Sequence, residues 1–82
     1  MKKIKNLIIL TLSNDMVFEV EKIFDDGEWA LKAFKIEESG ETTCGVVGEY
    51  DITKSLEDNL IDLWEYLDDF VKSPMGEFLF GN

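Results

Sequence analysis

The most regular apolar pattern along the chain lies in residues 53–73. Its members recur at intervals of three and four, the spacing of one helix face: Leu56, Leu60, Leu63, Trp64, Leu67, Phe70 and Val71. Thr53 or Ser55 supplies a side-chain oxygen suited to an N-cap, and Ser73 ends the helix because the residue before a proline avoids helical geometry. The pattern therefore predicts one long helix over residues 53–73.

Shorter apolar runs, alternating or rich in branched residues, occupy the first part of the chain and are typical of strands. Four such runs are present: residues 4–12, 16–24, 29–36 and 42–52. The alternation slips between Leu31 and Phe34, which indicates a bulge, while Gly45 and Gly48 weaken the prediction for the fourth run. Residues 75–80 are expected to form a short edge strand or a docked tail that packs under the sheet.

Polar turns separate these runs, at residues 13–15, 25–28 and 39–41. Short Ser, Asn and Asp side chains bond to nearby backbone groups, and the Asp26-Gly27 pair tolerates positive φ. Strands joined by such short turns pair in sequence order. The prediction is an α+β fold, with an antiparallel sheet of about four strands in a meander, one long C-terminal helix packed on one face, and a single domain over residues 1–82.

The chain is strongly acidic. It has 18 Asp and Glu against 8 Lys, a formal net charge of −10, and neither His nor Arg. The negative sign disfavours direct nucleic-acid binding and association with anionic membranes, and no run approaches the roughly 20 apolar residues of a membrane helix. The single cysteine, Cys44, has no internal disulfide partner, which fits a reducing cytoplasmic location.

Four acids of the predicted helix recur at spacings of 4, 3 and 4, and form what we call the acidic row: Asp58, Asp62, Glu65 and Asp69. They fall within an arc of roughly 60° opposite the apolar face and span about 16 Å. Like charges four residues apart weaken a helix, so stability alone does not account for the row. The functional interpretation is a surface complementary to something basic, such as the nucleic-acid groove of a DNA- or RNA-binding protein.

Three further residues are predicted to support the acidic row: Glu57, Asp68 and Tyr66. Tyr66 lies at the edge of the apolar face, where its ring and hydroxyl suit a protein contact. In the alternative interpretation the row is simply solvated, because a chain of low pI places acids on the polar face by composition alone. Acids of the predicted loops would extend the surface if their turns lie beside the helix: Glu37, Glu38, Glu41, Glu49 and Asp51.

No catalytic or metal-binding motif accompanies these acids in the sequence. No histidine is present to activate the Cys44 thiol, and residues 25–28 lack the alternating ligand spacing of a calcium loop. Gly45 and Gly48 are not followed by the lysine of a phosphate-binding loop. The sequence therefore predicts a non-enzymatic protein with no cofactor and no bound metal.

In length, acidity, its lone cysteine and its acidic helix, the chain resembles the small acidic proteins of bacteriophages and mobile elements that inhibit host defence. These include anti-CRISPR proteins and DNA-mimic anti-restriction proteins. The resemblance extends over all 82 residues as general character and carries no residue-specific motif. It implies a mechanism of stoichiometric binding to a nuclease complex, without turnover.

These features predict a cytoplasmic acidic inhibitor, a monomer or weak homodimer, that binds the basic nucleic-acid-binding surface of a partner protein. A CRISPR or restriction nuclease complex is the expected kind of partner, and the acidic row with Glu57, Asp68 and Tyr66 is the expected contact. Two alternatives stay open. One is an immunity or antitoxin-like protein that neutralises a toxin, and the other is an acidic adaptor subunit that binds through an edge strand or the tail.

Overall fold

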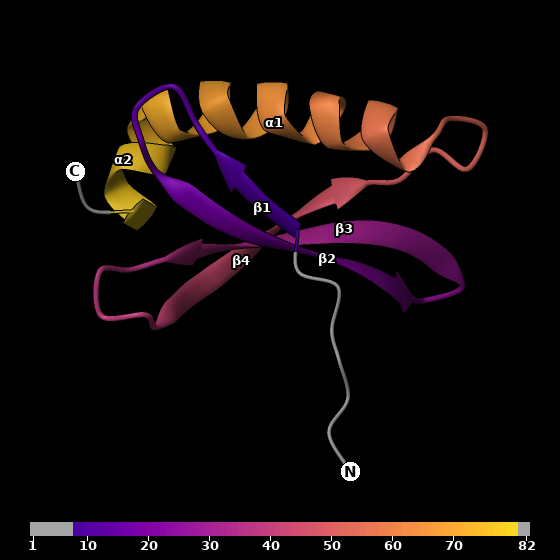
Figure 1. Ribbon diagram of the computed structural model, residues 1–82, viewed down its shortest axis with the longest axis horizontal. Coiled ribbons are helices and arrows are strands. Elements are labelled where there is room, and N and C mark those ends of the chain that lie inside the picture. Colours follow the sequence, from indigo (N-terminus) through magenta and orange to yellow (C-terminus); the bar gives the residue numbers. More distant parts are fainter. Residues whose placement is uncertain (1–7, 81–82) are drawn as a thin grey trace, which may run out of the picture.

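The computed structural model describes residues 8–80, which form a four-stranded antiparallel sheet and two helices (Figure 1). The elements are β1 (Ile8–Thr11), β2 (Val17–Asp25), β3 (Glu28–Ile36), β4 (Thr42–Glu49), α1 (Leu56–Lys72) and α2 (Pro74–Phe80). The strand order β1-β2-β3-β4 follows the chain, which confirms the predicted α+β meander. α1 runs along one face of the sheet, and α2 lies at its C-terminal end (Figure 1).

The predicted turns are present between the strands. Asp26 and Gly27 form the β2–β3 turn with φ of 55° and 79°, and the residues on either side, Asp25 and Glu28, pair with each other. Gly40 adopts φ of 89° in the β3–β4 turn. Glycine, asparagine and aspartate adopt positive φ more readily than other residues. These residue types therefore predicted the positions of the two turns correctly.

The last strand is shorter than the apolar run that predicted it, and only part of the first run lies among the described residues. β1 begins at Ile8, and residues 4–7 of the predicted run lie outside the described residues. β4 ends at Glu49 because the chain then turns toward α1, where the Lys54 N–H donates to the Asp51 carbonyl at 3.1 Å. The apolar run at residues 42–52 therefore overestimates the length of β4.

The predicted bulge lies at a different place from the slip in alternation. The pairing of β3 with β4 is regular as far as Phe34, and its register shifts between Phe34 and Ile36. Leu31 keeps a regular partner, Gly48. The slip between Leu31 and Phe34 therefore reflects Phe34 lying with Lys32 on the side of the sheet opposite α1, while Leu31 and Ala33 face the core.

The hydrophobic core lies between the sheet and α1. Strand alternation puts Phe18 of β2 and Leu31 of β3 on the face toward the helix, and both are fully buried. Leu67 and Val71 of α1 are buried against them. Burial of each such side chain contributes about 1.5–3 kcal/mol. This packing fixes the rotation of α1, so that its polar face, with the acidic row, points away from the sheet.

α1 begins and ends at serine caps. The Ser55 hydroxyl accepts a hydrogen bond from the Asp58 N–H at 3.1 Å, so Ser55 and not Thr53 is the N-cap. Glu57 and Asp58 lie in the first turn and Lys72 in the last, which complements the helix dipole at both ends. The helix is therefore shorter than the predicted residues 53–73 by a few residues at its start.

The C-terminal tail docks on the core through Phe80, but it does so as a second helix, which corrects the prediction of a single helix and of an edge strand. Residues 74–80 form a second helix, α2. Pro74 occupies its first position, where a missing N–H costs nothing, and the Ser73 hydroxyl accepts from the Gly76 N–H at 3.2 Å. Ser73 thus ends one helix and caps the next. The fold has two C-terminal helices instead of one.

Candidate functional site

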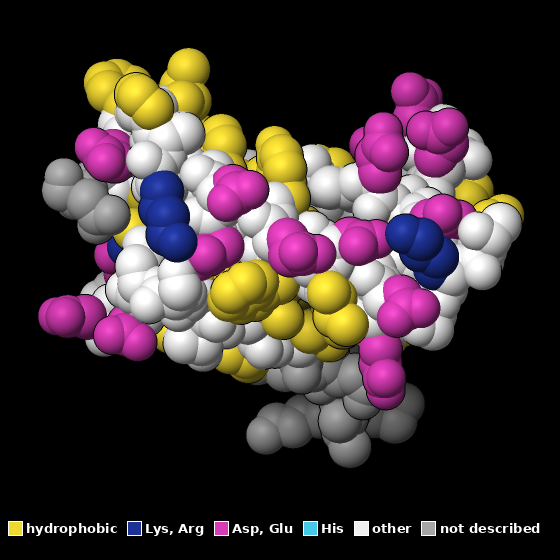
Figure 2. Space-filling view, turned by 90° about the horizontal axis from the view of Figure 1, so that it is seen from above, with side chains coloured by type: hydrophobic (Ala, Val, Ile, Leu, Met, Phe, Trp, Pro, Cys, Tyr) yellow, Lys and Arg dark blue, Asp and Glu magenta, His cyan; other side chains and the backbone are white. Residues whose placement is uncertain are grey.

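The acidic row lies on the outer face of α1 and points into solvent. Asp58, Asp62, Glu65 and Asp69 are all exposed. Figure 2 shows acidic side chains in a line over α1, with a lysine toward each end of the line and apolar side chains on both flanks. The structure therefore brings together the four residues that the helical spacing predicted, on one rigid element.

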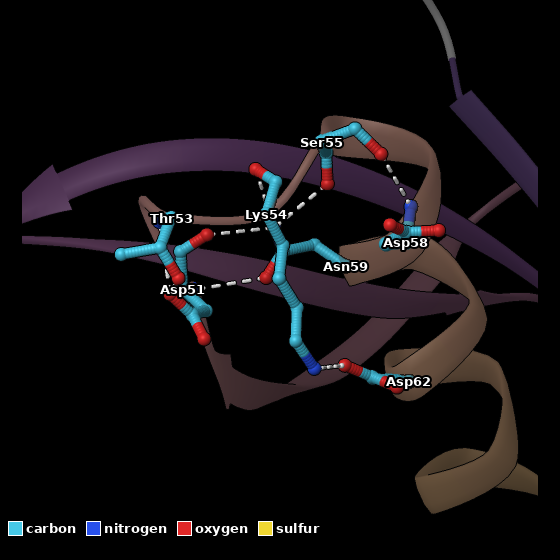
Figure 3. Close-up of polar contacts among 7 residues, drawn as sticks. All are labelled: Asp51, Thr53, Lys54, Ser55, Asp58, Asn59 and Asp62. Carbon is cyan, nitrogen blue, oxygen red and sulfur yellow. Dashed lines mark hydrogen bonds and ion pairs between the residues drawn. The ribbon is translucent and has the colours of Figure 1, made fainter.

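One member of the row is paired. Lys54 Nζ lies 2.9 Å from Asp62 Oδ2, reaching across from the loop before α1 (Figure 3). The hydrogen bond from this lysine and the charge of Asp62 raise the pKa of Lys54 above its ordinary value. Both groups are exposed, so the pair is screened by solvent and readily exchanged. Among the described residues the other three members of the row have no ion pair.

A buried amide holds the loop that carries Lys54. Asn59 is 3% exposed, and its Nδ2 donates to the carbonyls of Asp51 and Ser55 at 2.9 and 2.8 Å. Its Oδ1 accepts from the Asp51 N–H at 2.8 Å (Figure 3). The side chain therefore ties the end of the sheet to the first turn of α1. Sequence reasoning missed this residue, although a polar side chain on the apolar face of a helix was the available signal.

The three supporting residues of the predicted site differ in their surroundings. Glu57 is exposed in the first turn of α1, and Tyr66 is 51% exposed with its ring stacked on Phe70 at 6.0 Å between centroids. Asp68, in contrast, is 8% exposed. Its Oδ1 accepts from the hydroxyl and the backbone N–H of Ser13 at 2.7 and 3.0 Å, and its Oδ2 pairs with Lys72 at 3.0 Å. Asp68 therefore binds the β1–β2 turn to α1.

The contacts of Asp68 predict an acid-sensitive contribution to stability. The Ser13 hydroxyl, the Lys72 ammonium and the Ser13 N–H lower the pKa of Asp68 below its ordinary value. A carboxyl group whose pKa is lower in the folded state than in the unfolded state stabilises the folded protein. This stabilisation is fully present above the unfolded pKa of about 3.9, and it is lost as the pH falls through the folded pKa. We expect Asp68→Asn to lower the melting temperature by about 5 °C at pH 7.

Measuring the melting temperature at low pH tests whether the ionised Asp68 carboxylate causes this stabilisation. The difference in melting temperature between wild type and Asp68→Asn should shrink as the pH is lowered from about 4 towards 2, because the wild-type carboxylate is then protonated. The neighbouring Asp69→Asn is the control, since Asp69 is exposed and has no polar partner among residues 8–80. An equal loss of stability in both variants, or a difference that does not depend on pH, would contradict the assignment.

A groove runs beside the acidic row, between α1 and the edge strand β4. It has a volume of about 630 Å³, and its lining includes Val47, Tyr50, Leu63 and Tyr66 as well as the carboxylates of Glu49, Asp51 and Asp62. α1 approaches β4 closely, because a Cβ on Gly48 would lie 2.9 Å from Leu63 Cδ1. Glu49 and Asp51 therefore extend the acidic surface, as anticipated for acids of neighbouring turns.

The remaining acids of the predicted loops, Glu37, Glu38 and Glu41, do not line this groove. Glu37 is paired with Lys35 at 3.0 Å, and Glu37 and Glu38 line a separate hollow with the β1–β2 turn. In the described part of the chain, no three acidic or cysteine side chains gather closely enough to hold a metal ion. Neither α1 nor α2 has the length and apolar character needed to span a bilayer. The acidic row and its groove are thus the clearest candidate site.

The large aromatic residues are divided between core and surface. Trp64 is half-buried against the core, and its Nε1 donates to the Thr11 carbonyl at 2.8 Å. Trp29 is partly exposed and packs edge-to-face on Phe24 at 4.9 Å. Phe78 is 83% exposed on α2, so the tail packs through Phe80 alone among its aromatic residues.

The fold and the site define a small α+β protein with an acidic helix face beside an edge strand. Comparison of the chain with protein-family models, with curated proteins and with solved structures finds no match. Function is therefore inferred from the geometry of the site.

Proposed function

We propose that this protein is a non-enzymatic inhibitor that binds the basic nucleic-acid-binding surface of a partner protein in the cytoplasm. The partner class is a nucleic-acid-handling complex such as a CRISPR or restriction nuclease, and binding blocks its substrate. The observation that carries the proposal is the acidic row, exposed along one face of α1. Glu57 and Tyr66 supply further contacts at its margin, while Asp68 supports the row by fixing α1 to the β1–β2 turn.

The spacing of charge supports this class of partner. The row carries four carboxylates over about 16 Å, or one per roughly 5 Å, whereas a DNA strand carries one phosphate per 3.4 Å of axis. A channel lined with lysine and arginine for phosphates therefore meets a similar density of negative charge. The formal net charge of −10 also favours rapid, salt-sensitive association with a basic surface.

The surroundings of the row also favour recognition over simple solvation. α1 is held at both ends, by Asn59 at its start and by Asp68 near its end, so the carboxylates are positioned before binding. Tyr66 adds an exposed ring whose orientation is set by stacking on Phe70. A rigid helix that presents charge next to an aromatic anchor loses little conformational entropy on binding.

Neutralising the row tests the proposal. The combined variant Asp58→Asn, Asp62→Asn, Glu65→Gln and Asp69→Asn should fold with equal or slightly higher stability, because like-charge pairs four residues apart are removed. We expect wild-type protein to capture a nucleic-acid-binding protein from a bacterial lysate, and the variant to retain about tenfold less of it. Added double-stranded DNA and added salt should both release the captured protein.

A matched control removes the same amount of charge elsewhere. Its substitutions are at exposed acids that line neither the groove nor the hollow beside the other side of β4: Asp15→Asn, Glu38→Gln, Glu41→Gln and Glu77→Gln. This variant should capture as much partner as wild type. Equal capture by all three proteins would contradict the proposal, and retention of a toxin that DNA does not displace would favour an immunity protein instead.

A further inference from the structure

We propose that the edge of β4 that no strand of residues 8–80 covers accepts an extended, lysine- or arginine-bearing segment of the partner, which adds to the sheet as a fifth strand beneath the acidic row. This inference rests on the proposed function, because it takes the partner to be basic. It adds a second mode of recognition. Main-chain hydrogen bonds to β4 hold the segment, and the acidic residues favour segments that carry basic side chains.

β4 is an edge strand with little protection from Gly45 to Glu49, where its pairing with β3 is regular. It pairs with β3 on one side, and within residues 8–80 no strand covers its other side. Natural edge strands are protected by shortness, proline, lysine or β-bulges, and the register shift in β4 lies before Gly45. β4 has eight residues and contains neither proline nor lysine, and its single charged residue is Glu49. The opposite edge, β1, has four residues, and the carbonyl of its last residue, Thr11, is bonded by Trp64.

The groove beside β4 has the shape and chemistry for such a segment. Gly48 allows α1 to lie directly against the strand, so the groove is walled by the β4 edge on one side and by Leu63 and Tyr66 of α1 on the other. Its carboxylates outnumber its one lysine, and that lysine is already bonded to Asp62. A basic side chain entering the groove would therefore meet net negative charge.

The register of β4 indicates which side of the sheet each side chain of an added strand would face. Gly48 pairs with Leu31 and faces α1, whereas Val47 pairs with Lys32 and faces the other side of the sheet. Side chains of an added strand alternate in the same way. Those on the α1 side would lie beside Tyr66 and Asp62, and those on the opposite side would lie beside the exposed Val47.

Charge argues against a second copy of this chain as the occupant. Edge-to-edge pairing of two β4 strands would place two molecules with a formal charge of −10 each side by side, with their acidic rows next to the same seam. Like charges brought together in this way oppose association. A positively charged segment is attracted to the same edge, so the expected occupant is basic.

The test uses a capped octapeptide of alternating lysine and valine as the probe. A second peptide of the same sequence is N-methylated at two adjacent central residues, which removes one ladder donor from each of its edges. Binding is followed by backbone amide shifts of the isotope-labelled full chain. We expect the plain peptide to shift the amides of residues 45–49 and to slow their hydrogen exchange, and the methylated peptide to bind about tenfold more weakly.

Several results would overturn strand addition. These are equal affinity for both peptides, shifts confined to the acidic row, no binding at millimolar peptide, or self-association of the chain through residues 45–49. Running the four-site neutral variant in parallel separates this inference from the proposed function. If that variant binds the plain peptide as tightly as wild type and still discriminates against methylation, the edge is the binding site and the role of the acidic row is contradicted.

Discussion

Gly76→Ala is expected to destabilise the protein by about 2–4 kcal/mol, because α2 then loses its place against α1. A Cβ on Gly76 would overlap the Phe70 carbonyl oxygen and lie 2.7 Å from Val71 Cα. Both are backbone atoms, so neither can rotate aside. The helix must separate, which exposes Phe80 and breaks its edge-to-face contacts with Phe18 and Phe70. Urea unfolding of both proteins measures the loss.

Phe80→Ala provides the companion measurement. If both substitutions act by undocking α2, the double variant should lose little more stability than either single variant. Glu77→Ala is the control, since Glu77 is exposed on the same helix. Wild-type stability in Gly76→Ala, or fully additive losses in the double variant, would show that α2 is not held by this close approach.

Asn59→Ala is expected to cost about 2–3 kcal/mol, since hydrogen bonds of about 1 kcal/mol each are lost and the helix propensity of alanine offsets only about 0.5 kcal/mol. The Asp51 N–H and carbonyl lose their partner, and so does the Ser55 carbonyl. The measurement is again the free energy of unfolding in urea. Glu57→Ala, in the exposed first turn of the same helix, should change it by less than about 0.5 kcal/mol.

A second readout tests the structural role of Asn59. Because Asn59 fixes the loop that carries Lys54, backbone amide exchange in residues 50–55 should accelerate more than exchange in β2. Unchanged stability together with unchanged exchange would mean that the amide is dispensable. Uniform acceleration over the whole chain would instead indicate global destabilisation without a local role for the loop.

Periodicity predicted the larger elements well, for physical reasons visible in particular residues. α1 was predictable because its apolar face spans several turns, and the turns because Asp26, Gly27 and Gly40 supply positive φ. α2 was not predictable from periodicity, because seven residues that include a proline and a glycine are too few to show a helical repeat of apolar positions. Its formation depends on Ser73 as a cap and on Phe80 entering the core, and the second is a tertiary contact.

The candidate site was partly predictable in the same sense. Helical spacing placed the acidic row on one outward face, and the structure confirms that all four residues are exposed there. Asp68 sits nearer the apolar face, and its partner Ser13 is 55 positions away in the chain, so its burial could not be derived from local pattern. The groove likewise depends on how closely α1 approaches β4, which is decided by Gly48 and Leu63 in three dimensions.

The meander also determines how the molecule assembles. Each strand pairs with its neighbour in sequence, so the sheet closes through short loops at low entropic cost, and such hairpins form quickly. Docking of the helices joins distant parts of the chain, because α1 brings the β1–β2 turn to Asp68 and α2 brings Phe80 to Phe18. We therefore expect the folding barrier to lie at helix docking, with substitutions that weaken Leu67 slowing refolding more than equally destabilising ones in the β2–β3 turn.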